Sequence, residues 1–524
     1  MTVQARDLVL EEESDGLTGP LRLVGDATAI NRFANDTAYF SVQCKAEKPL
    51  RAFSYYDVSD QSLARRGVFL RAVGAGRDPA PGPAPASLFD QAPSVAPNLK
   101  KASGQFASRD VSQAASPNGK DRVGALLATA PPLKHIFTIA KQTSWRLASF
   151  EAETPFASVT LYLAEALDGA RARFGVIDLL DEDPVRRLKR GEQTLRAGGG
   201  ALTVLGQSLP GYSARILGLD GGLKAANKIV SPADPSAGAM LHAGLCFSAN
   251  RIAETGRALN SGAPEALRHA RVAMRRFRSI ERVFRKAAAS TALKTLSAEA
   301  RILAGVLGEA RDWDLFLSDT LPAVEDIASA PAGIEKLRAR ALSLRARAWA
   351  RVEQTTHEPE FRILPLRILE AAEKLDMSTP AMQARAPDFA RRALDRRLEK
   401  AREAAADLSV KAPEAGHPLR IELKKMRYAS QLFRSQFDPA RRKPYMQAMS
   451  LMQDSFGALN DAVVAQALSA RAAEGAGGAA LGASGFVAGY SAARAEHAAR
   501  AILPAWKAFN DMTPFWRYPE KSAC

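Results

Sequence analysis

The second half of the chain matches itself at a single offset of 149 residues, and this internal repeat limits the folds that the chain can adopt. The match needs no gap across about 45 residues, and it continues from one predicted helix into the next. The matched pairs are Arg271 with Arg420, Val272 with Ile421, Arg275 with Lys424, Arg276 with Lys425, Arg278 with Arg427, Gly308 with Gly457, Ala310 with Leu459, and Asp312 with Asp461. The sequence therefore predicts two pseudo-repeated helical bundles.

The first half of the chain has a different composition. Short β-branched or aromatic runs, separated by Gly and Pro, predict the strands of an α+β domain. These runs lie at 21–24, 68–73, 136–139, 159–163 and 174–180. In the second half, Ala, Leu and Arg recur at helical spacing, which predicts an all-α domain. We expect an N-terminal domain at 1–218 with a disordered Pro-rich insertion at 74–121, a linker at 219–235, a helical domain at 236–512 and a tail at 513–524.

The charge is distributed unevenly between the two halves. The chain has 524 residues and a formal net charge of +16. Residues 1–224 contain 27 basic and 24 acidic residues, whereas the remainder contains 45 basic and 32 acidic residues. Such an excess indicates a polyanionic partner for the helical half.

Cysteine spacing and hydropathy exclude several classes of protein. Cys44, Cys246 and Cys524 form no CxxC pair, so the sequence predicts neither a disulfide framework nor a thiolate metal cluster. No apolar run approaches the ~18 residues of a membrane span, and acidic residues near the N-terminus argue against a signal peptide. We expect a cytoplasmic protein.

A row of arginines follows the predicted helix at 267–286 at steps of three and four residues, which places them in one stripe. They are Arg268, Arg271, Arg275, Arg278, Arg282 and Arg285. The apolar residues beside the stripe, which we expect in the core, are Ala270, Met274, Phe277, Ile280 and Phe284. In the second copy, the stripe positions are Arg420, Lys424, Arg427, Gln431 and Arg434, and the apolar residues are Leu419, Leu423, Met426 and Phe433.

Like charges one helical turn apart repel by a few tenths of a kcal/mol per pair, so each stripe is mildly destabilising unless something compensates. Glu281 is the only acid in the segment and cannot reach every guanidinium. A linear polyanion would compensate by releasing its condensed counterions, and arginine can chelate two phosphate oxygens. The alternative is a solvated surface, or neutralisation by acids of other helices. The acids considered are Asp312, Asp314, Asp454 and Asp461.

These motifs resemble the CHAD domain, the conserved-histidine α-helical domain, whose basic helices follow the pattern H-x-x-R-V-x-x-R-R-x-R. The second copy matches at His417, Arg420, Ile421, Lys424, Lys425 and Arg427, with a later G-x-x-N-D element at Gly457, Asn460 and Asp461. The first copy has a G-x-x-R-D-x-D element at Gly308, Arg311, Asp312 and Asp314. Arg268 stands at its histidine position, and His269 follows one residue later, which is about 100° around the helix. The resemblance covers roughly residues 236 to 512.

The resemblance implies paired helical bundles whose basic central surface binds inorganic polyphosphate. His417 would then donate a hydrogen bond to phosphate. Together with the stripes, the resemblance gives a set of candidate polyphosphate-binding residues. They are Arg268, His269, Arg271, Arg275, Arg276, Arg278, Arg282, Arg311, His417, Arg420, Lys424, Lys425, Arg427 and Arg434.

The N-terminal half resembles CYTH domains, the triphosphate tunnel family, at residues 53–73. This resemblance implies an antiparallel, eight-stranded tunnel or barrel-like domain. The metal-binding E-x-E-x-K strand of that family corresponds here to residues 6–10, where Asp7 is the only acid. Because a hydrolytic Mg²⁺ or Mn²⁺ site needs several converging carboxylates, the domain is identified as a degenerate member. Phosphate contacts by Arg71, Lys141 and Arg146 are an alternative to their being ordinary surface cations.

The preferred hypothesis is non-catalytic binding of polyphosphate, with a further hypothesis of association with polyphosphate granules. It involves no catalytic residue, metal or cofactor. The first alternative is a metal-dependent triphosphatase or polyphosphatase that uses the N-terminal domain. The second is nucleic-acid binding through phosphate contacts, although aromatic residues for base stacking are sparse.

Overall fold

The computed structural model divides the chain into two compact units, Met1–Lys228 and Ile229–Cys524, which we describe separately. It describes residues 8–12, 21–34, 41–46, 51–57, 68–72, 134–148, 157–206, 208–219, 229, 235–259, 262–327, 331–406, 408 and 416–517. The insertion predicted at 74–121 lies outside these residues, and so does nearly all of the predicted linker.

The N-terminal unit contains an antiparallel sheet, which confirms the predicted α+β class. Its strands are β1 (Leu8–Glu12), β2 (Arg22–Asp26), β3 (Ser41–Ala46), β4 (Arg51–Asp57), β5 (Val68–Ala72), β6 (Lys134–Ala148), β7 (Ala157–Ala166), β8 (Arg171–Leu179) and β9 (Leu202–Val204). The strand order is β1-β5-β4-β6-β7-β8-β2-β9, and β3 also pairs with β6. All five runs that predicted strands contribute to it. Closure into a tunnel stays a prediction.

Three helices accompany the sheet: α1 (Ala27–Ala34), α3 (Pro184–Ala197) and α4 (Leu209–Ile216). Gly175 of β8 allows α1 to approach closely, because an added Cβ would lie 2.7 Å from a side-chain carbon of Ile30. On β7 and β8, Tyr162 and Phe174 stack with ring centroids 5.4 Å apart, and Tyr212 of α4 meets Phe174 edge-on. Aromatic packing of this kind supplies the core of the unit.

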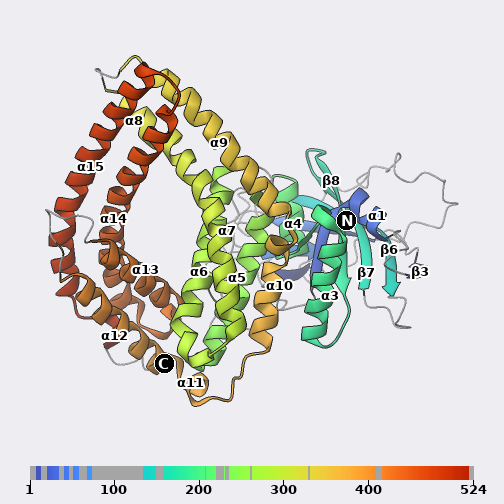
Figure 1. The fold of residues 1–524 in the computed structure, drawn as a ribbon. Coiled ribbons are helices and arrows are strands. Elements are labelled where there is room, and N and C mark those ends of the chain that lie inside the picture. The colour runs from blue at the N-terminus through green and yellow to red at the C-terminus, as the bar shows by residue number, and fades with distance from the viewer. Residues whose placement is uncertain are drawn as a thin grey trace. The chain divides into compact units, whose positions relative to one another are not determined.

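The second unit is all-α, as predicted (Figure 1). Its elements are α5 (Ala237–Ala258), α6 (Pro264–Ala288), α7 (Thr291–Leu315), the π-helical turn η6 (Phe316–Thr320), α8 (Leu321–Glu325), α9 (Ile334–His357), α10 (Pro359–Glu373), α11 (Pro380–Gln383), α12 (Ala386–Ala404), α13 (Gly416–Leu432), η8 (Arg434–Gln436), α14 (Pro439–Ala473), α15 (Gly478–Asn510) and η9 (Phe515–Arg517). Helices α5, α6 and α7 pack in sequence, and α14 packs along α15. The prediction that the unit consists of two pseudo-repeated helical bundles stays a prediction.

Helix α6 begins with Pro264 in its first turn, where a missing N–H costs nothing, and ends before Ala289 in the left-handed region, with φ 46°. All five apolar residues predicted for its core face are buried, and so are the four of the second copy, three on α13 and Phe433 directly after it. Phe284 stacks on Phe389 of α12 with centroids 4.7 Å apart. This apolar packing fixes the rotation of α6 and therefore the direction of its arginine stripe.

Residues 513–517, which begin the predicted tail, contain the short helix η9 (Phe515–Arg517). Phe515 and Trp516 of η9 are buried, and the Trp516 indole donates a hydrogen bond of 2.9 Å to Asp395 of α12. Burial of these two large aromatic residues stabilises the position of η9 by removing apolar surface from water. Among the described helices, none is long and apolar enough to span a membrane.

Candidate functional site

Helices α6 and α13 pack against each other and bring four cationic side chains together. We call these residues, Arg271 and Arg275 of α6 with Arg420 and Lys424 of α13, the inner cluster. Lys424 experiences the positive charges of all three arginines, and Arg420 also experiences that of Arg275. The two stripes therefore approach each other where α6 meets α13.

The inner cluster is incompletely neutralised by nearby carboxylates. The Arg271 guanidinium lies 3.6 Å from Asp312 of α7, and Asp461 of α14 is the carboxylate that acts on Arg420. The buried Nε atoms of Arg275 and Arg420 have no hydrogen-bond partner among the described residues. Four cations thus face two acids, and two buried N–H groups of the cluster are left without a hydrogen-bond acceptor among the described residues.

The pKa values of the cluster reflect burial and crowding of like charge. Burial, followed by the charges of Arg420 and Arg275, lowers the pKa of Lys424 to about 8. Burial also lowers the pKa values of Arg271 and Arg420, although neighbouring Asp312 and Asp461 oppose the shift. The site consequently holds positive charge at an energetic cost, which a bound anion would relieve.

A second group of arginines surrounds the other side of the contact between α6 and α13. We call Arg276 of α6, Arg427 of α13, Arg434 of η8 and Arg442 of α14 the outer cluster. Burial lowers the pKa of Arg276, as do the charges of Arg251, Arg427 and Arg434; burial and Arg434 lower that of Arg442. The buried Nε atoms of Arg276 and Arg442 have no hydrogen-bond partner among the described residues.

Side-chain packing holds the outer cluster in position. The Arg276 guanidinium lies over the Phe247 ring of α5, 4.9 Å from its centroid, and Arg427 donates a hydrogen bond of 2.6 Å to Gln453 of α14. Contacts of this kind orient a guanidinium without neutralising it. Arg442 was not among the residues predicted from the sequence. Its repeat counterpart would be Leu293, so the repeat carried no signal for it.

Three further candidate residues lie near the inner cluster: Arg278 and Arg282 continue the stripe along α6, and Arg311 belongs to α7. The pKa of Arg278 is lowered first by burial and then by the charges of Arg282 and Arg301. Arg311 lies near enough to Arg271 to lower its pKa. Arg278, Arg282 and Arg311 therefore extend the positive surface beyond the inner cluster.

The remaining candidates lie apart from both clusters or bind local acids. Arg268 and His269 contact Glu265 at 2.8 and 3.3 Å, and burial lowers the pKa of His269. Lys425 forms an ion pair with Glu422. His417 is exposed in the first turn of α13. Arg285 of the stripe also binds a local acid, the buried Glu281, at 2.7 Å.

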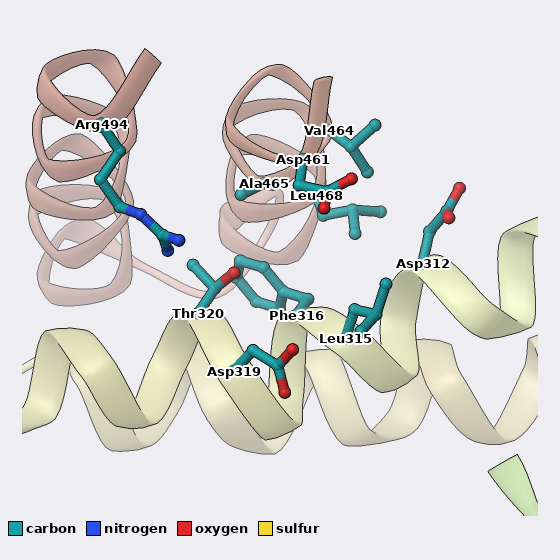
Figure 2. A pocket seen from close by; sticks show the side chains of 10 residues that line it. All are labelled: Asp312, Leu315, Phe316, Asp319, Thr320, Asp461, Val464, Ala465, Leu468 and Arg494. Atoms are coloured by element: carbon teal, nitrogen blue, oxygen red, sulfur yellow. The ribbon is translucent and has the colours of Figure 1, made fainter. Parts of the chain in front are cut away.

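A small cavity of about 70 Å³ lies between η6 and the helices α14 and α15 (Figure 2). Asp312, Asp319 and Asp461 line it together with Arg494. Two of these acids also face the inner cluster, so the cavity is the acidic side of the site. Within the described part of the chain, no group of three His, Cys, Asp or Glu residues is arranged to hold a metal ion.

Most of the N-terminal residues considered as metal or phosphate ligands have side chains outside the described part of the structure. Asp7 lies outside the described residues, and the side chains of Arg71 and Arg146 are not described either. The acids of β8 and the following turn pair locally: Asp178 with Arg22 at 2.7 Å and Asp181 with Arg186 at 3.3 Å. The predicted degenerate tunnel therefore remains an expectation.

Comparisons with known proteins concern the helical unit. The CHAD domain family matches residues 246–470, which contain every residue of both clusters. The crystal structure of the CHAD domain from the plant Ricinus communis is 26% identical, with a TM-score of 0.47, and the match covers 54% of this chain and 97% of that one. PptA from Streptomyces chartreusis is 20% identical, with a TM-score of 0.43, and the match covers 52% and 99%. No curated protein matches the chain.

Proposed function

We propose that the helical unit binds inorganic polyphosphate, without cleaving it, through the inner and outer clusters. The match of residues 246–470 to the CHAD domain family supports the proposal. The family is associated with polyphosphate binding, which supports this choice of ligand. One observation carries the proposal: Arg271, Arg275, Arg420 and Lys424 lie together, and these four cations outnumber the two carboxylates beside them.

A linear polyphosphate fits the two clusters better than a single phosphate does. Arg275 and Arg276 are adjacent on α6, so their side chains leave the helix about 100° apart and serve different clusters. A chain of linked phosphates can occupy both clusters in one binding event, whereas separate ions would each lose translational freedom. Arginine also suits phosphate because its planar fork chelates two oxygens.

Nucleic acid is the less favoured polyanion. Binding of single strands depends on aromatic side chains that stack on bases. Phe277 and Phe284 of α6 are fully buried in the core, and the Phe247 ring is already covered by Arg276. Polyphosphate lacks bases and requires no such platform.

The central test is a variant in which Arg271, Arg275, Arg420 and Lys424 are all replaced by Ala. We expect polyphosphate affinity to fall. We also expect the slope of log Kd against log salt concentration to decrease by roughly three, because each phosphate contact contributes about 0.7–0.9 to that slope through counterion release. Fluorescence titration at several salt concentrations measures both quantities, and circular dichroism checks that helicity is retained.

A matched control removes the same charge elsewhere. Lys336 and Arg347 of α9 and Arg396 and Lys400 of α12 are exposed, so replacing these four by Ala lowers the net charge equally. The proposal is wrong if this control weakens binding as much as the cluster variant does. It is also wrong if single-stranded RNA displaces polyphosphate at equal phosphate concentration.

The absence of cleavage is tested separately, by phosphate release from polyphosphate and triphosphate in the presence of Mg²⁺ or Mn²⁺. We expect no metal-dependent turnover. Turnover that Asp7→Ala abolishes would instead establish the N-terminal unit as a hydrolase. Granule association is a further proposal, for which co-sedimentation with polyphosphate granules is the measurement.

A further inference from the structure

Lys424 differs chemically from the other residues of the inner cluster. Arginine remains protonated at every pH at which proteins are folded, whereas a crowded, partly buried lysine can lose its charge near neutral pH. The groups that act on Lys424 are Arg420 of its own helix, Arg271 and Arg275 of α6, and Asp461 of α14. One titratable amine thus has three permanent cations and one carboxylate around it.

The other elements packed against α13 direct their charges elsewhere. Arg397 of α12 binds Glu422 at 3.4 Å, on the side of α13 that also carries Lys425. In η8, Arg434 acts on Arg276 and Arg442. Asp461 is therefore the carboxylate that acts on Lys424 among the described residues, and it does not cancel three guanidinium groups.

We propose that Lys424 couples polyanion binding to proton uptake: the amine is uncharged in the empty site at mildly alkaline pH and takes a proton from solvent when a polyanion enters. This inference rests on the proposed function and concerns the regulation of the same site. The packing of α6 against α13 carries it, because it brings Lys424, one helical turn from Arg420, up to Arg271 and Arg275 of α6. A phosphate chain bound by these arginines would replace net repulsion at Lys424 with attraction.

The direction of the pH dependence follows from linkage. The pKa of Lys424 is about 8 in the empty site, against an ordinary value of 10.5. A bound polyanion favours the charged amine and returns its pKa toward or above the ordinary value. Affinity is therefore greatest below pH 8 and falls as pH rises between the two values. From pH 7 to pH 9 the expected loss is about tenfold.

Isothermal titration calorimetry of the full chain with long-chain polyphosphate tests this coupling. Titrations at pH 8.5 in buffers of low and high ionisation enthalpy give the number of protons exchanged, and we expect uptake of about 0.7 proton by the wild type. Lys424→Arg keeps the positive charge but cannot titrate, so we expect no uptake at this residue and affinity that no longer falls tenfold from pH 7 to pH 9.

The matched control is Lys425→Arg, which changes the adjacent lysine that is paired with Glu422, and we expect it to retain the uptake. Lys424→Met provides a second variant if Lys424→Arg does not fold. It should bind more weakly at pH 7 and show no uptake. Circular dichroism establishes folding of each variant.

The outcomes separate the coupling from the proposed function. Failure of the wild type to bind polyphosphate at pH 7 contradicts the function itself. Binding at pH 7 without proton uptake at pH 8.5, or uptake that persists in Lys424→Arg, overturns the coupling and leaves the function standing. Loss of uptake in Lys425→Arg also overturns it, because the proton would then belong to the other lysine.

Discussion

Individual residues of the helical unit show how similar side chains acquire different roles. Asp312 and Asp314 are two positions apart in one motif, and a helix turns about 200° over that interval. Asp312 faces Arg271 and the inner cluster, whereas Asp314 is buried and accepts hydrogen bonds from Arg345 and Trp349 of α9 at 2.6 and 3.0 Å. The sequence motif named both acids as possible partners of the stripe, and only the packing of α9 distinguishes them.

Lys424 should limit the stability of the empty protein. We expect Lys424→Met to increase the free energy of unfolding at pH 7 by about 0.5–2 kcal/mol, because it removes a like charge from a crowded cluster. The pKa of Lys424 is about 8 in the folded protein and 10.5 ordinarily, so between pH 8 and pH 10.5 the unfolded chain binds more protons than the folded one. The free energy of unfolding of the wild type therefore rises with pH over this range and approaches that of Lys424→Met. Urea unfolding at pH 7 and pH 10 measures the difference, which should shrink at the higher pH. An equal or larger difference at pH 10 would contradict this assignment.

At the scale of helices, the apolar faces were more predictable than the charged ones. Met274 and Phe277 of α6, and Leu423 and Met426 of α13, are fully buried as their spacing predicts, because one helix has one face to bury. The partner of each arginine depends instead on which helices meet. Arg442 joined the outer cluster through the packing of α14, which no local pattern encodes.

The contact between α7 and α9 should depend on Asp314. Replacing Asp314 by Ala leaves the partly buried Arg345 without its carboxylate, and we expect the free energy of unfolding to fall by about 3 kcal/mol. Asp319→Ala, at an exposed residue of the neighbouring η6, is the control and should change stability by less than about 0.5 kcal/mol. Urea denaturation followed by circular dichroism gives both values. Since Asp314 faces away from the inner cluster, folded Asp314→Ala should bind polyphosphate normally; selective loss of binding without loss of stability would refute its structural role.

In the molecule as a whole, the change in net charge along the sequence and the boundary between the two compact units fall at nearly the same residue. The net positive charge lies mainly after residue 224, and the structural boundary lies between Lys228 and Ile229. In the sequence, net charge changes near this boundary together with the change from strand to helix periodicity. Sequence patterns could not predict the burial of Phe515 and Trp516, because these two aromatic residues follow no repeat and carry no helical period.

Separate expression of the two units tests where binding resides. Each unit has its own buried core, so residues 229–524 should fold alone and bind polyphosphate with a Kd within about threefold of the full chain and the same salt dependence, because both clusters lie within that fragment. Residues 1–228 carry little net charge and should bind at least about tenfold more weakly at the same salt concentration. Fluorescence titration of both fragments measures this, with circular dichroism and urea unfolding as controls for folding. A folded helical fragment that loses affinity would mean that the N-terminal unit contributes cations to the same polyphosphate chain.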